Sequence, residues 1–280
     1  MRNFIIITFL VLHTNIAYSG GGWPQSKKIG YYKIGQNWIV SSSFYGPQGD
    51  IVDIRTTGLY TTSFYGEYGV TNRLTAILYF PFFVRNTLHE ERFNQSGIVI
   101  PGESFNSIGD TDVSFKYGLI VNKPVVLSAS VLLGLPLGKT SGGASEILQT
   151  GDGEFNQMVR VDASGSFYPL PLYASGYFAF NNRTANFSDE FRFGIEVGYT
   201  FFKRLTTIVK INVVESLFNG SEPVADNGIF SNNTEYVSPM IEVGYAVNDK
   251  WGISSSGGFA LSGKNILASP NWGVGIYAKF

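Results

Sequence analysis

The chain has 280 residues, of which 15% are charged and 15% aromatic; it contains 33 glycines, no cysteine, and a formal net charge of −1. This charge offers no basic surface to a nucleic acid, and the lack of cysteine excludes disulfides and thiolate metal sites. Charged residues are scarcer than the roughly 25% of a typical soluble domain, while the mean hydropathy of +0.07 excludes a bundle of transmembrane helices. Alternating polar and apolar residues in a β-barrel give this composition.

Residues 1–19 predict an export signal. Arg2 precedes an apolar run from Phe4 to Leu12, and Ala17-Tyr18-Ser19 places small residues at the two cleavage-determining positions. A membrane anchor is the alternative, but the run is too short to span about 30 Å of hydrocarbon. We expect a cleaved signal peptide over 1–19, a periplasmic N-terminal arm over 20–29, and one domain over 30–280.

From Gly30 onward, twelve stretches have the alternation and composition of β-strands. They cover 30–41, 55–70, 73–85, 110–121, 124–137, 154–167, 172–183, 190–202, 204–217, 235–247, 251–262 and 271–280.

The connections between these stretches alternate in length. Short turns lie at 71–72, 122–123, 168–171, 203 and 248–250, and longer polar loops cover 42–54, 86–109, 138–153, 184–189, 218–234 and 263–270. Short periplasmic turns and long external loops are typical of outer-membrane barrels. The pattern predicts an all-β fold, a transmembrane antiparallel up-and-down β-barrel of about 12 strands in the cell outer membrane, with both termini periplasmic. A soluble β-sandwich would have no reason to alternate its loop lengths.

The stretch 190–201 shows which face is which. Its odd positions are large and apolar, whereas its even positions include Glu190, Arg192 and Glu196. An Arg or Lys facing lipid near the midplane costs roughly 2–4 kcal/mol, so the charged face is expected to line the lumen. In a soluble protein the same face would meet water. The predicted lumen-lining residues are Lys33, Glu67, Asp110, Asp112, Lys116, Glu154, Arg160, Asp162, Arg183, Glu190, Arg192, Glu196, Lys210 and Glu242.

Two interpretations of this inward set stay open. The charges could form a lattice of ion pairs that fills a narrow lumen, or some of them could line a solute path. A barrel of about twelve strands is wider than the eight-stranded size that side chains alone fill. Some lumen is therefore expected unless a loop or the arm plugs it.

The terminal stretch 271–280 is expected to pair with 30–41 and close the ring. Its odd residues would face inward, and Trp272, Val274, Ile276 and Phe280 would face lipid. Aromatic residues near strand ends fit interfacial girdles, although aromatic residues are common in any strand. The candidates are Trp38, Tyr79, Tyr117, Tyr199, Tyr245, Trp251 and Trp272.

The sequence gives little support for a catalytic or metal site. His89 is the one histidine after the predicted signal, and it lies in a polar loop, so a Ser-His-acid hydrolase is not expected. Asp110 and Asp112 share a strand face and could bind a hard cation, but pairing with Lys116 or Arg160 explains the same spacing. We expect no enzyme activity, no metal and no cofactor.

Residues 107–119 (SIGDTDVSFKYGL) resemble the "GDTD…KYGL" strand of the family named for the MetA pathway of phenol degradation, whose members are outer-membrane β-barrel transporters. Segments 134–138, 151–157 and 188–192 also resemble parts of this family, and Gly21-Gly22-Trp23 resembles its versions from Bacteroidetes-type bacteria. The resemblance implies passage of small, hydrophobic or aromatic compounds. It also implies that Phe280 is the signal read by the barrel-assembly machinery.

We therefore expect a channel or transporter for passive uptake of small solutes, with access controlled by loops 86–109 and 138–153. Its expected partners are outer-membrane lipid, the barrel-assembly machinery and a small-molecule solute. The alternative is a plugged structural or interaction barrel of a cell-envelope complex, with no transport activity.

Overall fold

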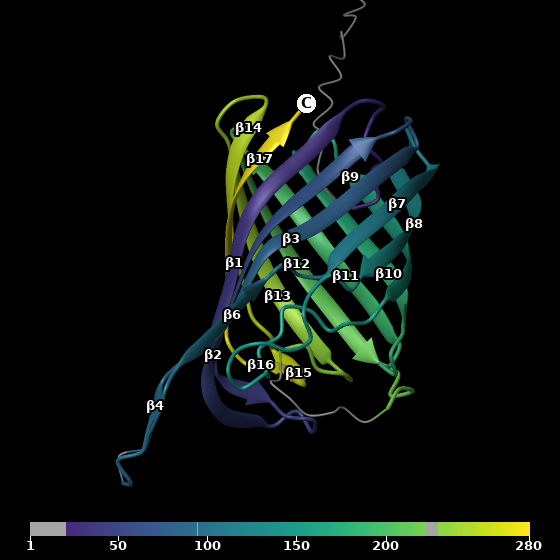
Figure 1. Ribbon diagram of the computed structural model, residues 1–280. Helices are drawn as coiled ribbons and strands as arrows, with labels where there is room; N and C mark the ends of the chain where they lie inside the picture. Colours follow the sequence, from purple (N-terminus) through teal and green to yellow (C-terminus); the bar gives the residue numbers. More distant parts are fainter. Residues whose placement is uncertain (1–20, 94, 222–228) are drawn as a thin grey trace, which may run out of the picture.

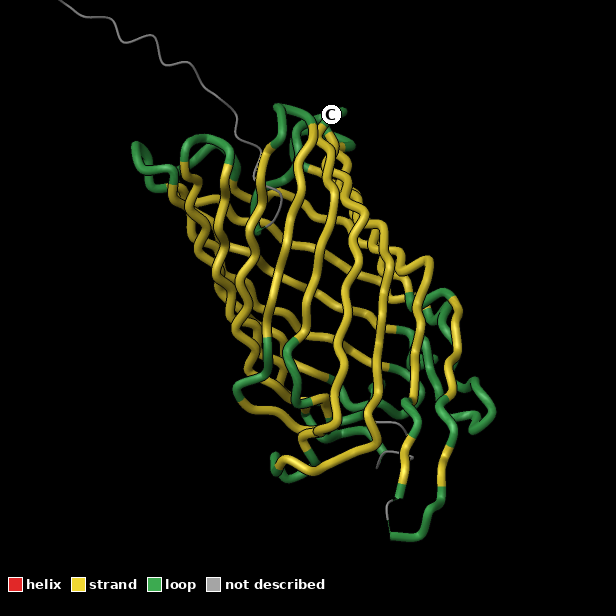
Figure 2. Tube along the Cα trace, turned by 90° about the vertical axis from the view of Figure 1, so that its left-hand side faces the viewer, coloured by secondary structure: helices red, strands yellow, loops and turns green. Residues whose placement is uncertain are grey.

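The computed structural model describes residues 21–93, 95–221 and 229–280, and the predicted signal peptide lies outside them. The described chain forms a closed antiparallel β-barrel (Figures 1 and 2). Its wall contains β1 (Gly30–Tyr45), β2 (Ile51–Gly69), β3 (Leu74–Leu88), β7 (Thr111–Ile120), β8 (Val125–Leu135), β9 (Asn156–Ser166), β10 (Leu172–Arg183), β11 (Glu190–Phe201), β12 (Leu205–Ser216), β13 (Glu235–Ala246), β14 (Trp251–Gly258) and β17 (Asn271–Lys279). β17 pairs with β1, as predicted, and β12 pairs with β13, so the ring has no open edge. The predicted twelve-stranded barrel is confirmed.

Short turns lie at one end of the barrel, here called the turn end, and the longer connections lie at the other, the loop end. The predicted loop over 42–54 is wrong, because β1 and β2 stay paired up to Tyr45 and Ile51. Serine and aspartate made this stretch resemble a loop, but backbone pairing does not require apolar side chains where a hairpin extends beyond the wall.

The predicted loop over 86–109 also contains strands. β6 (Glu103–Ser107) pairs with the end of β3, and β4 (Glu91–Arg92) pairs with β5 (Val99–Ile100) in a hairpin that projects away from the barrel (Figure 1). Near the C-terminal end of the chain, β15 (Ser262–Lys264) pairs with β13, and β16 (Ile266–Leu267) pairs with β1. The loop end is therefore more ordered than its polar composition indicated.

The two faces of the wall differ sharply in chemistry. Large apolar side chains such as Val159, Ile195 and Ile276 are exposed on the outside, whereas Glu67 and Asp162 on the inside are fully buried. A soluble protein has the opposite arrangement, and a barrel surrounded by hydrocarbon has this one. No helix in the described ranges is long and apolar enough to span a membrane.

Tyr79 departs from the predicted aromatic girdle. It lies directly opposite Tyr65 and Asp112, and so on the same face as these inward residues. The cause is strand parity, since Tyr79 is an even number of residues from the buried Thr75. Tyr79 therefore belongs to the interior.

Candidate functional site: the barrel interior

The start of the described chain, residues 21–25, lies inside the turn end of the barrel. The Gly22 N–H donates to Ser164 Oγ at 2.7 Å, and the Lys116 ammonium donates to the Gly21 carbonyl at 2.8 Å. Ser164 on β9 and Lys116 on β7 are both buried inward residues. The arm therefore obstructs the lumen instead of hanging free beyond it.

Gln25 and Trp23 attach the same segment to other strands. The Gln25 N–H donates to Thr75 Oγ1, and its side-chain amide donates to Glu67, both at 2.8 Å. Trp23 packs edge-on against Tyr173, with ring centroids 5.7 Å apart. Residues 21–25 thus reach β2, β3, β7, β9 and β10 across the interior.

Tyrosine rings line the interior near the arm. Tyr31 stacks on Tyr277 at 5.6 Å between centroids and contacts Tyr65 edge-on at 6.2 Å. The Tyr65 hydroxyl donates to the Glu67 carboxylate. These rings pack against one another and carry hydroxyl groups at their edges.

Charged pairs cross the middle of the barrel. Glu242 on β13 binds Lys33 of β1 at 2.8 Å and Lys210 of β12 at 3.1 Å, and Lys210 lies 3.7 Å from Glu196 of β11. Nearby, Arg160 forms a forked ion pair with Asp162, its shortest N–O distance being 2.6 Å.

A further cluster surrounds Arg183 at the loop end. Its guanidinium binds Asp152 at 3.1 Å, Glu190 at 2.7 Å, and Glu154. Arg192 binds the other oxygen of Glu190 at 2.6 Å. The cluster is tightly satisfied, as buried charges require.

The loop over 138–153 folds across the loop end of the interior. Asp110, just before β7, accepts the N–H groups of Gly138 and Asp152 at 2.8 and 2.9 Å. Burial raises the pKa of Asp110 to about 6. The Asn86 amide donates to the Gln149 carbonyl at 3.0 Å, and Leu148 is buried. The lumen is thus narrowed at both ends.

The structure places the predicted lumen-lining residues in separate clusters, and the predicted pairing of Asp110 with Lys116 or Arg160 is wrong. Asp110 bonds loop amides and not Lys116 or Arg160, because the loop folds onto Asp110 while Lys116 binds the arm. Asp152, which lies in the predicted polar loop 138–153, was not among the predicted site residues. In the described ranges, no group of His, Cys, Asp and Glu has the arrangement of a metal site.

The interior is not completely filled. Asn37 lies beside Lys33 and Gly273 on the inward face of β1, yet its side chain is exposed. The Arg192 side chain is 38% exposed although it points inward. Solvent-sized space therefore remains between the arm and the loop 138–153.

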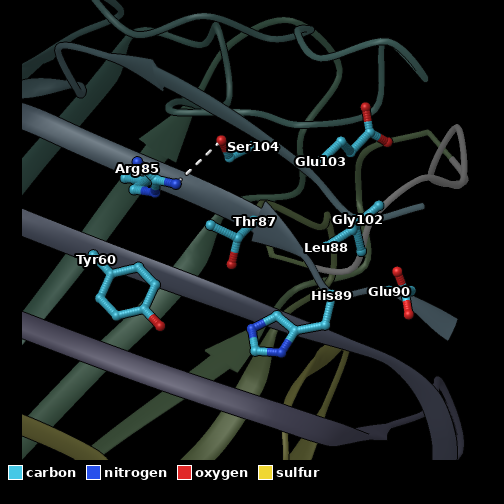
Figure 3. A pocket seen from close by; sticks show the side chains of 9 residues that line it. All are labelled: Tyr60, Arg85, Thr87, Leu88, His89, Glu90, Gly102, Glu103 and Ser104. Carbon is cyan, nitrogen blue, oxygen red and sulfur yellow. Dashed lines mark hydrogen bonds between the residues drawn. The ribbon is translucent and has the colours of Figure 1, made fainter.

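His89 lies outside this interior. It borders a pocket of about 740 Å³ on the outer wall, between β2, β3 and β6 (Figure 3). Its side chain is exposed, as expected of a solvated loop histidine.

No protein-family model matches the sequence, and no curated protein is significantly similar to it. Solved structures do share its architecture. The chain is similar to the COG4313 outer membrane channel from Pseudomonas putida F1, with a TM-score of 0.60 and 12% identity over 94% of this chain and 100% of that one. It is also similar to the NanC porin, with a TM-score of 0.54 and 9% identity over 89% of this chain and 100% of that one. At these identities the likeness is one of fold: the chain has the barrel wall found in these two proteins.

Proposed function

We propose that the protein is an outer-membrane channel for passive uptake of small solutes, hydrophobic or aromatic ones among them. The observation that carries this proposal is the open space around Asn37 and Arg192, enclosed by an apolar-coated barrel. A purely structural barrel has no need of an accessible interior. The fold shared with an outer membrane channel supports the same proposal.

The arm is the obstruction that must yield for solutes to pass. Each hydrogen bond described above for residues 21–25 has a side chain as donor or acceptor, and none is part of a strand ladder. The two bonds between neutral groups contribute about 0.5–1.5 kcal/mol each, and the two that involve Glu67 and Lys116 about 1.5–3 kcal/mol each. Since these bonds lie outside the strand ladders, this segment can leave the lumen without opening the wall.

The tyrosine rings and the balanced charges of the interior are the basis for the proposed preference for aromatic solutes. The rings of Tyr31, Tyr65 and Tyr277 would contact an aromatic solute, while the Lys33–Glu242 pair and its neighbours keep the net field small. The resemblance to the phenol-degradation family points to the same solute class and stays a prediction.

The test is permeability of the purified, folded protein in liposomes and planar bilayers. We expect a small conductance from the full mature chain and a larger one after deletion of residues 21–25. Faster uptake of phenol than of a sugar of similar size would support the aromatic preference.

The second candidate is a plugged barrel of an envelope complex, favoured by the dense bonding of the arm and of the Arg183 cluster. This candidate would be favoured if neither the full mature chain nor the deletion of residues 21–25 conducted in bilayers although both were folded, and if a stoichiometric partner co-purified.

A further inference from the structure

An outward row of directly opposed residues crosses four neighbouring strands of the wall. The register places Trp272 of β17 opposite Trp38 of β1, Trp38 opposite Tyr60 of β2, and Tyr60 opposite Arg85 of β3. Directly opposed residues share a face, and Trp272 is 52% exposed, so the row faces outward. Trp and Tyr gather where hydrocarbon meets headgroups. Because barrel strands are tilted by about 35–45°, the row runs obliquely through the interfacial zone on the loop-end half of the barrel.

The outer-wall pocket begins at the Tyr60–Arg85 end of this row. Tyr60 and Arg85 belong to both the row and the pocket, and Thr87, His89 and Ser104 add polar groups toward the loop end (Figure 3).

Arg85 is available to a ligand. Its guanidinium donates to Ser104 Oγ at 3.3 Å, and it has no carboxylate partner among the described residues. By contrast, the two acids of the pocket are already engaged: Glu90 binds Arg92 at 2.5 Å, and Glu103 accepts the Ser145 N–H at 3.0 Å. An unpaired guanidinium at headgroup level is suited to a phosphate, which it can bind through two parallel bonds.

The wall on the hydrocarbon side of Arg85 is apolar. Phe83, two residues away on the same outward face, is 42% exposed, and the bulge before it leaves Phe82 exposed as well. A ligand with a phosphate at Arg85 would thus place apolar chains against these rings. Free phosphate could bind Arg85 but would leave the apolar rings of Phe82 and Phe83 without a contact.

We propose that this pocket binds the phosphorylated headgroup of a lipid in the outer leaflet. The proposal rests on the membrane placement proposed above, but not on transport. The ligand is a phospholipid-like or saccharide-linked phosphate with acyl chains, and the pocket holds the barrel at a fixed depth and rotation relative to it.

The test is native mass spectrometry of the folded, detergent-solubilised barrel, with bis-phosphorylated lipid A as the probe. Dephosphorylated lipid A and inorganic phosphate serve as competitors. We expect Arg85→Gln to lower lipid A retention about tenfold, the effect of losing a charged hydrogen bond. The matched control Arg73→Gln, an exposed arginine at the turn end, should retain it fully. His89→Ala, beyond the end of β3, should lower retention to a smaller degree.

Heat-modifiable migration confirms that each variant is folded, and flotation of the wild type with liposomes checks membrane placement separately. Wild-type retention by folded Arg85→Gln or His89→Ala would overturn the assignment, as would an equal loss in Arg73→Gln. Displacement of lipid A by inorganic phosphate at equal concentration would also overturn it, because the site would then recognise the anion alone.

Discussion

Lys33 and Glu242 form an ion pair through the interior of the barrel. Their Nζ and Oε1 atoms are 2.8 Å apart, although β17 and β14 separate their strands in the wall. Lys210 binds the other oxygen of the same carboxylate at 3.1 Å. One carboxylate therefore links three strands across the lumen, in surroundings where attraction between charges is stronger than at an open surface.

Replacing Glu242 with Gln should destabilise the barrel by about 2–4 kcal/mol, because it leaves two partly buried ammonium groups without their shared partner. The measurement is the urea midpoint of unfolding in detergent, followed by tryptophan fluorescence. Glu215→Gln is the matched control, since Glu215 is exposed on the neighbouring strand β12. Equal midpoints for the two variants would show that the link carries no net stability.

Gly21 should be essential for holding the arm in its position inside the barrel. Its φ is +63°, and a Cβ there would lie 2.7 Å from Ser164 Oγ. For a β-branched residue the backbone conformation alone costs about 1–3 kcal/mol. We expect Gly21→Val to displace the arm, raise single-channel conductance and shift Trp23 emission to the red. Lys27→Ala, on the exposed part of the arm, should change neither; unchanged conductance in Gly21→Val would argue against the arm as the obstruction.

Ion selectivity should change with pH through Asp110. This residue precedes β7, outside the membrane-spanning strands, and burial raises its pKa to about 6. At pH 5 it is mostly protonated, and at pH 8 it adds a negative charge to the loop end. We expect preference for cations over anions to rise about twofold between these values, since one charge in a hydrated pore contributes up to about 1 kcal/mol.

Reversal potentials in asymmetric KCl measure this preference. Asp110→Asn should abolish the step near pH 6, whereas Asp50→Asn, in an exposed turn at the same end, should leave it intact. The raised pKa also means that the folded state binds this proton more tightly than the unfolded chain. Its contribution to the free energy of unfolding therefore falls as pH rises from about 4 to about 6. A step that survives in Asp110→Asn would assign it to another group.

Strand positions could be predicted because each wall strand has one apolar and one polar face. In β11, the alternation from Glu190 to Phe201 fixed both the element and the inward direction of Arg192. The list of predicted lumen-lining residues followed from the same alternation along each strand.

The contacts that hold the arm and the loop 138–153 inside the barrel could not be predicted, because they are tertiary contacts of segments without periodicity. Gly21, Gly22 and Asp152 lie in Gly-rich polar stretches whose side chains do not indicate a direction. Lys116 and Arg183, which bind these residues, were predicted to line the lumen. The sequence indicated only ion pairs with other strand residues as their contacts.

Phe280 completes the seam between the first and last strands. Its backbone exchanges two hydrogen bonds with Gly30, at 2.7 and 3.0 Å, and its ring contacts Trp251 edge-on at 5.9 Å. We expect deletion of Phe280 to reduce the amount of heat-modifiable barrel in the outer membrane while export continues. Both the lost seam contacts and the lost assembly signal predict this result.

Two variants separate these causes. Phe280→Tyr keeps the aromatic terminus and the backbone bonds and should assemble normally. Phe280→Ala keeps the backbone bonds with Gly30 but removes the ring, so a defect as large as that of the deletion would assign the effect to the side chain. Refolding of purified Phe280→Ala in detergent at the wild-type yield, beside poor assembly in cells, would locate the defect in recognition by the assembly machinery. Normal assembly of the deletion variant in cells would refute the role of Phe280 altogether.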